Sequence, residues 1–114
     1  MEHIVRPQDS ASNYRSGTLE VFATPAMIAL MEQTAMNSVQ DLLPKGFSTV
    51  GVEIRTTHLK ATAIGKKVIC ESNLVIVSGK ELEFEISAFD EVNLIGKAYH
   101  KRVIIDVKRF LSRI

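Results

Sequence analysis

The sequence lacks the features that define several large classes of protein. A single cysteine, Cys70, excludes an internal disulfide and favours a reducing cytoplasm. No segment approaches the roughly 18 apolar residues of a membrane span, and the first residues contain no apolar core of signal-peptide length. A formal net charge of +1 gives no strong field for nucleic acid or a membrane surface. Composition therefore predicts one cytoplasmic globular domain over residues 1–114, with no nucleic-acid or membrane partner.

One long helix is predicted over residues 25–43. The hydroxyl of Thr24 can cap its first free N–H groups, Pro25 suits the first helical position, and a Pro-Lys-Gly turn ends it. Ala26–Met31 is an unbroken apolar run, which is typical of a buried helix. Glu32 follows this run directly, and a carboxylate is rarely buried unless it is paired. Glu32 is therefore either a solvent-facing residue at the helix edge or a group held in a cleft for chemistry.

Strands account for most of the remaining chain. A short alternating segment, Thr18–Phe22, precedes the helix, and the pattern after Phe47 has period two. The strands predicted there are 48–60, 67–77, 81–89 and 93–107, joined by tight turns. The first dozen residues look loosely structured. One helix followed by consecutive hairpins predicts an α+β hotdog fold, in which a curled antiparallel five-stranded sheet wraps around one long central helix.

The strand over 48–60 places a histidine on the side of the helix. The even-numbered residues from Val50 to Ile54 form the apolar face of this strand, and His58 shares their parity. His58 is thus expected on the same side as Glu32. Taken singly, His58 can be a satisfied residue at a strand end, Glu32 a partly exposed helix residue and Thr24 a plain cap. A hydroxyl at the helix start, an acid on the helix and a histidine on the facing strand are less expected together by chance than any one of them alone.

Four segments carry a resemblance to a known family: 22–25, 30–32, 48–53 and 57–62. They resemble the fluoroacetyl-CoA thioesterase-like family of hotdog-fold acyl-CoA thioesterases, over about residues 15–107. The spacing of eight from Thr24 to Glu32, and of 26 from Glu32 to His58, is similar to that of the family's threonine, glutamate and histidine. Gly51 falls where the family places a glycine whose backbone lies beside the substrate.

This resemblance implies an acyl-CoA thioesterase that hydrolyses a small acyl thioester to free acid and coenzyme A. Thr24, Glu32 and His58 would be catalytic and Gly51 substrate-binding, with no metal and with coenzyme A only as part of the substrate. Glu32 would act as nucleophile or general base, His58 as base or proton donor, and Thr24 as an oxyanion donor. Fluoroacetyl selectivity is associated in the family with an aromatic lid before the helix, whereas Arg15–Leu19 contains no aromatic residue.

Two other functions stay open: a hotdog hydratase or dehydratase acting on 3-hydroxyacyl or enoyl thioesters, and a non-catalytic acyl-thioester binding domain. Val103–Ile105 adds more apolar surface than one helix can cover, so a homodimer, or a tetramer, is expected. A site completed by both chains would also relieve the separation of about 12 Å that eight helical residues place between Thr24 and Glu32. His100–Arg102 is expected to face outward, without the partners of a metal site.

Overall fold

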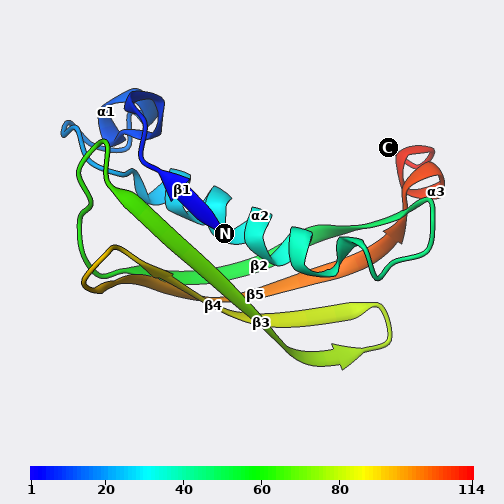
Figure 1. Ribbon diagram of the computed structural model, residues 1–114. Coiled ribbons are helices and arrows are strands. Elements are labelled where there is room, and N and C mark those ends of the chain that lie inside the picture. Colours follow the sequence, from blue (N-terminus) through cyan, green and yellow to red (C-terminus); the bar gives the residue numbers. More distant parts are fainter.

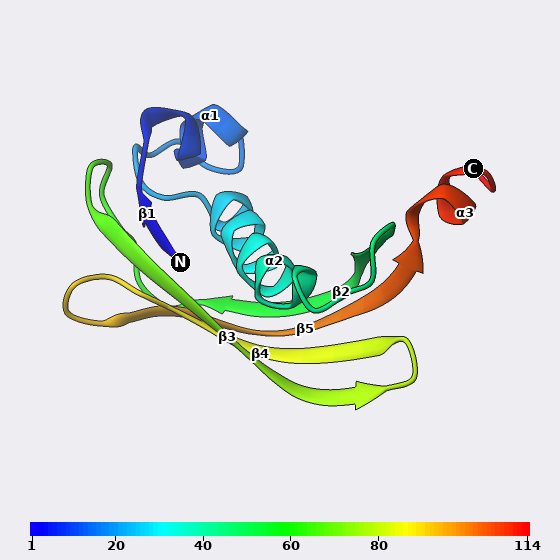
Figure 2. The ribbon, with the colours of Figure 1, turned by 45° about the vertical axis from the view of Figure 1, so that its right-hand side comes forward.

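A computed structural model describes all of residues 1–114. Its elements in chain order are β1 (Glu2–Ile4), the 3-10 helix η1 (Pro7–Asp9), α1 (Ala11–Tyr14), α2 (Thr24–Gln40), β2 (Phe47–His58), β3 (Lys67–Ser78), β4 (Glu81–Phe89), β5 (Leu94–Asp106) and α3 (Val107–Leu111). The five strands form one antiparallel sheet in the order β1-β3-β4-β5-β2. This sheet curls around α2 (Figures 1 and 2), which confirms the predicted architecture. None of the helices is long and apolar enough to cross a membrane.

The first strand of the sheet differs from the predicted one. Thr18–Phe22 forms no strand, and only isolated bridges are made by Val21 and Phe22. Phe22 is fully buried, so its apolar character reflects burial in the core rather than sheet pairing. Strand β1 lies instead within the first dozen residues, for which the expectation of loose structure is wrong, and it pairs with Lys67–Ile69 of β3. An alternating pattern indicates that one face of a segment is buried, but it does not identify the strand that pairs with the segment.

Helix α2 begins one residue earlier than predicted. Ala23, which has an extended backbone, is its N-cap, and Thr24 is already helical. The prediction that Thr24 caps the helix is therefore wrong, because a capping side chain must belong to the residue just outside the helix. The Thr24 hydroxyl is consequently available to another partner. Pro25 lies in the first turn as expected, and the helix ends at Gln40 rather than residue 43.

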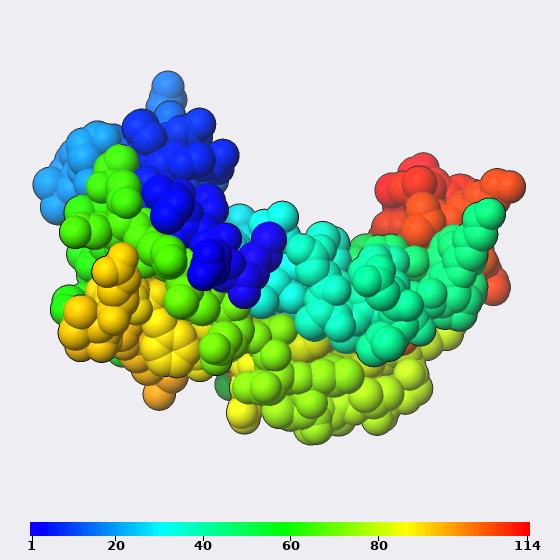
Figure 3. Space-filling model, viewed as in Figure 1, coloured from blue at the N-terminus to red at the C-terminus, as the bar shows by residue number.

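One side of α2 is packed and the other is open. Ala29, Gln33 and Asn37 are exposed along the open side, which lies between the N-terminal segment and α3 in the space-filling view (Figure 3). The run Ala26–Met31 is thus not buried all round, because Ala29 interrupts it. The packed side joins inward-facing residues of β3 and β4 in the core. These core residues are Ala26, Met27, Leu30, Met31, Ala35 and Val39 of α2, with Val68, Cys70, Leu82, Phe84, Ile86 and Ala88 of the sheet.

A β-bulge in β2 reverses the parity of the residues that face α2. Gly51 and Glu53 pair with successive residues of β5, so Val52 has no partner. Before the bulge the odd-numbered Thr49 is buried, and a Cβ added to Gly51 would point at α2. Val52 is exposed, so the prediction that it packs on the helix is wrong. Alternation from the buried Thr49 places the half-buried Val50 on the outer face as well.

Beyond the bulge the predicted parity holds. Thr56 Oγ1 lies 3.6 Å from Met31 Sδ on α2, and His58 hydrogen-bonds to the first residue of the same helix. The expectation that His58 faces the helix is therefore confirmed. The bulge lets one strand present both Gly51 and His58 to α2, although their numbers differ in parity.

Candidate active site

The first part of the candidate site lies where α2 begins. Thr24 Oγ1 and His58 Nδ1 are 2.8 Å apart and share a hydrogen bond. His58 ends β2, and the next two backbone N–H groups both donate to the carbonyl of Ile95, at 2.7 and 3.2 Å, which holds the strand end in place. Burial lowers the pKa of His58, so its imidazole is neutral near pH 7. The pair can therefore exchange a proton with a bound substrate.

A pocket of about 320 Å³ opens beside this pair. Its walls come from the segment before α2, from the residues after β2 and from the N-terminal region. The lining residues are Ala11, Ser16, Val21, Phe22, Ala23, Thr24, His58, Leu59, Lys60 and Ala61. Phe22 is the only Phe, Tyr or Trp among them, and the other apolar walls are small or aliphatic side chains. The pocket thus suits an apolar group placed next to the Thr24 hydroxyl.

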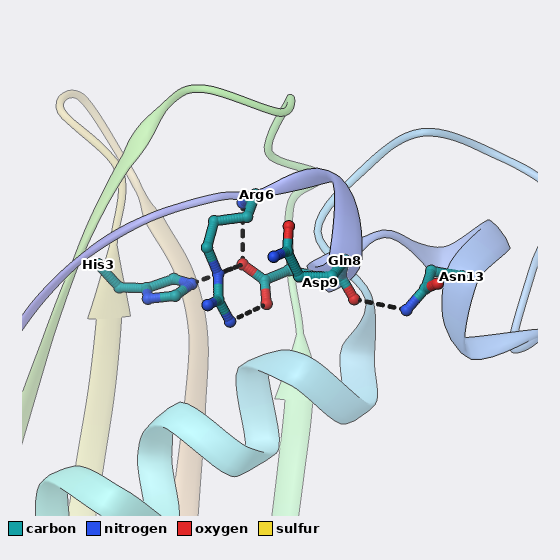
Figure 4. Close-up of polar contacts among 5 residues, drawn as sticks. All are labelled: His3, Arg6, Gln8, Asp9 and Asn13. Carbon is teal, nitrogen blue, oxygen red and sulfur yellow. Dashed lines mark hydrogen bonds and ion pairs between the residues drawn. The ribbon is translucent and has the colours of Figure 1, made fainter.

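The N-terminal wall of the pocket is tied to the start of α2 through Asp9. Figure 4 shows the contacts of the Asp9 side chain with His3 and Arg6. Its buried carboxylate accepts hydrogen bonds from the backbone N–H, Nε and Nη2 of Arg6, at 2.8, 3.1 and 2.9 Å, and lies 2.8 Å from His3 Nε2. Burial alone would raise the pKa of Asp9, but the bonds from Arg6 and His3 outweigh it and lower this pKa to about 2. The carbonyl of Asp9 accepts the N–H of Ala23 at 2.9 Å. Asp9 therefore holds the residue that precedes Thr24.

The second part of the site lies about two turns further along α2. Glu32 Oε2 is 3.8 Å from Arg102 Nη1, and a Cβ added to Gly51 would lie 2.7 Å from the same oxygen. The Glu32 side chain is 41% exposed and that of Arg102 is 6% exposed. The carboxylate is thus neither buried alone nor simply directed to solvent. It lies at an open edge, against a glycine backbone and a buried cation.

Two residues that were expected to face outward lie beneath Glu32. His100 and Arg102 are buried on the inner face of β5, so that expectation is wrong. Strand β5 is flanked by β4 and β2, and its inner face meets the core. The parity of β5 gives little signal for them, because Ala98 and Ile104, which share it, are apolar, but so are Val103 and Ile105 on the other face. No group of three or more His, Cys, Asp or Glu side chains could hold a metal ion.

The structure therefore joins the four predicted site residues in two pairs. Thr24 contacts His58, and Glu32 contacts Gly51. The pairs lie on one side of the sheet and are separated along α2 by eight residues, or about 12 Å. Across that distance one thioester carbonyl cannot contact both pairs of the same chain.

Comparisons with known proteins find a matching family and a similar enzyme. Residues 5–108 match the model of the FlK family, fluoroacetyl-CoA-specific thioesterase. The fluoroacetyl-CoA thioesterase of Streptantibioticus cattleyicolor is 35% identical over 95 residues, which cover 83% of this chain and 68% of that protein.

Solved structures show the same arrangement of the chain. A mutant of the fluoroacetyl-CoA-specific thioesterase FlK, in complex with fluoroacetate and CoA, is 30% identical with a TM-score of 0.91, over 96% of this chain and 93% of that chain. A hot-dog-like protein from Thermanaerovibrio acidaminovorans is 24% identical with a TM-score of 0.90, over 99% and 84% of the two chains. The second likeness concerns the fold alone.

Proposed function

This chain belongs to the FlK family of fluoroacetyl-CoA-specific thioesterases, and from that premise we propose that Thr24, Glu32 and His58 hydrolyse the thioester of a small acyl-CoA. The protein is an acyl-CoA thioesterase with the hotdog fold, and coenzyme A is part of its substrate. Membership of this family favours hydrolysis over hydration, dehydration or binding without turnover. The observation that carries the proposal is the hydrogen bond between Thr24 and His58 at the edge of an apolar pocket.

Thr24 and His58 have complementary roles in this proposal. When the imidazole proton is on Nδ1, His58 donates to Thr24 Oγ1, and the hydroxyl proton of Thr24 is left to bind the oxyanion that forms on the thioester carbonyl. The start of α2 adds backbone N–H groups and the positive end of the helix dipole. In this tautomer Nε2 carries no proton to give, and it is buried without a partner, so the departing thiolate of coenzyme A takes up the proton that the attacking water loses.

Glu32 supplies the negative charge that the reaction needs. Its carboxylate either attacks the thioester carbonyl or removes a proton from the attacking water, and both routes end in free acid and coenzyme A. About 12 Å of helix separates Glu32 from Thr24 in one chain, so the Glu32 that acts at the carbonyl bound by Thr24 comes from a second chain. The close backbone of Gly51 leaves room for a reacting group beside the carboxylate. The small acyl group is supported by the fluoroacetate bound in a related enzyme and by the modest pocket volume of about 320 Å³.

We further propose that the enzyme is a homodimer. Strand β1 covers only the first residues of β3, so the edge of β3 beyond Cys70 has no partner strand. Leu74, Val75, Ile76 and Val77 on this edge are between 42% and 64% exposed. An exposed apolar edge is a template for pairing with another chain, and a two-fold axis lets two identical edges pair with each other.

Residues 1–114 form one catalytic domain in this proposal, and its location is the cytoplasm. The lone Cys70 is buried and forms no disulfide, which accords with a reducing compartment.

The test is the release of free thiol from acetyl-CoA by matched variants. Glu32→Gln keeps the side-chain shape but removes the charge, and His58→Ala removes the ring, so each should lower kcat by about 10²- to 10⁴-fold. The double variant should be far less than multiplicatively worse, because the residues act as one unit. Gln33→Ala, at an exposed position next to Glu32, is the control and should retain full activity. Nearly full activity of a folded Glu32→Gln enzyme would refute the proposal.

A further inference from the structure

The inner face of β5 holds a histidine that the proposed reaction does not use. His100 is 1% exposed, and both of its ring nitrogens are engaged. Nδ1 lies 2.8 Å from the carbonyl oxygen of Glu53, just after the bulge in β2, and Nε2 lies 3.1 Å from Nη1 of Arg102. The ring also lies beside Gly51, where Cε1 would be 3.2 Å from an added Cβ. His100 thus connects the bulge to the guanidinium beneath Glu32.

These two neighbours determine the proton positions on His100. A carbonyl oxygen only accepts a hydrogen bond, so Nδ1 must carry the proton. A guanidinium nitrogen only donates, so Nε2 must be the unprotonated acceptor. A second proton on the ring would place an N–H against the N–H of Arg102 and would set two cations side by side. The imidazole is therefore neutral and has one tautomer.

The guanidinium of Arg102 is held on three sides. Its Nε donates to Thr49 Oγ1 at 2.8 Å and its Nη2 donates to the Thr49 carbonyl at 2.9 Å. His100 accepts from the third nitrogen, Nη1, and this is the nitrogen that lies 3.8 Å from Glu32 Oε2. Thr49 therefore holds one edge of the guanidinium, and the ring of His100 holds the nitrogen nearest to Glu32.

We infer that His100 is a positioning residue, whose neutral imidazole orients Arg102 and thereby holds the Glu32 carboxylate beside Gly51. This inference rests on the proposed catalytic role of Glu32. His100 itself does not touch the substrate. Its contribution is the fixed orientation of a charge, and a displacement of about 1 Å at a catalytic group can lower a rate by about 10²-fold.

Two substitutions separate the positioning role from a structural one. His100→Gln places an amide oxygen near the position of Nε2, so it keeps an acceptor for Arg102 and loses the bond to Glu53. His100→Asn places an amide nitrogen near the position of Nδ1, so it keeps the donor to Glu53 and loses the acceptor for Arg102. Each variant leaves one buried polar atom without a partner, so both should lose a similar amount of stability.

The measurement is steady-state hydrolysis of acetyl-CoA by the full-length chain, together with thermal unfolding. We expect His100→Gln to stay within about threefold of the wild-type kcat, and His100→Asn to lose about 10- to 100-fold in kcat with little change in KM. In the Glu32→Gln background His100→Asn should lower kcat no further. If His100→Asn does not fold, Arg102→Lys provides the same test, because a lysine cannot bond to Thr49 and His100 in the geometry of the guanidinium, and the same loss of kcat is expected.

Equal activity of the two His100 variants, or a loss in both that follows their melting temperatures, would overturn the inference, as would unchanged kcat in Arg102→Lys. These outcomes differ from failure of the proposed function. If Glu32→Gln is inactive and His100→Asn is fully active, only the positioning role of His100 is wrong. If Glu32→Gln is fully active, the catalytic role of Glu32 is wrong as well.

Discussion

Adding a single methyl group at Gly51 should disable the enzyme without unfolding it. The Cβ of Gly51→Ala would lie 2.7 Å from Glu32 Oε2, so the carboxylate must move about 0.7 Å to reach an ordinary contact of 3.4 Å. His100 Cε1 and Arg102 Nη1, at 3.2 and 3.3 Å, must also yield by a few tenths of an ångström. A displacement of this size at a catalytic group predicts a loss in kcat/KM of about 10- to 100-fold.

The cost to folding should be small at the same position. The atom in closest contact is the free end of a flexible and partly exposed side chain, which can turn toward solvent. Replacement of glycine by alanine also restricts the unfolded chain, which offsets part of the strain by about 0.4–1 kcal/mol. The free energy of unfolding of Gly51→Ala should therefore stay within about 1 kcal/mol of the wild-type value.

A second glycine provides a matched control. An added Cβ at Gly96 would meet Met27 Sδ at 2.6 Å and the carbonyl of Thr57 at 3.2 Å. Met27 is fully buried, so Gly96→Ala overpacks the core and should cost about 1–3 kcal/mol of stability. Gly51→Ala should thus lose activity and Gly96→Ala stability. Thiol release from acetyl-CoA and urea unfolding, measured on both variants, test this difference. Full kcat/KM in Gly51→Ala would refute the placement of Glu32 against this backbone.

Two further predictions concern stability and assembly. Asp9 has a folded pKa of about 2 against an ordinary 3.8, so its charged form stabilises the fold above pH 3.8 by about 2 kcal/mol, and this contribution is lost as the pH falls toward 2. Urea unfolding should show Asp9→Asn to be less stable than the wild type by about that amount at pH 7. If this difference in the free energy of unfolding did not narrow near pH 2.5, the ion pairs of Figure 4 would be contradicted. Ile76→Lys on the free edge of β3 should convert the dimer to a monomer in sedimentation experiments, whereas Val92→Lys in the exposed turn should leave it a dimer. A monomeric wild-type protein at micromolar concentration would exclude the dimer.

Local chemistry in the sequence was sufficient for the main elements of the fold. The helix carries a repeated apolar pattern and a proline in its first turn, and each hairpin strand alternates between two faces. These signals depend on neighbours within a few residues, so they predicted α2, β2, β3, β4 and β5 to within a few residues. The spacing of Thr24, Glu32 and His58 is likewise a property of the chain alone, and it is sufficient to indicate the family.

Contacts between distant segments were beyond the reach of such patterns. Strand β1 exists because residues near the N-terminus meet the start of β3. Thr24 is free to bond with His58 because Ala23, whose N–H donates to Asp9, occupies the N-cap position. The bulge at Val52, which reverses the parity of β2, can be recognised only from the pairing of β2 with β5.

The environment of Glu32 separates what the sequence determines from what the tertiary structure determines. The sequence determined that a carboxylate follows an apolar helical run, and that its spacing from a threonine and a histidine is that of a thioesterase family. Only the tertiary structure decided that a buried guanidinium lies beneath it, because Arg102 and His100 reach the core through the pairing of β5 with two neighbouring strands. A charge can be buried only where its partners come from elsewhere in the chain, and those partners are set by the fold rather than by neighbouring residues.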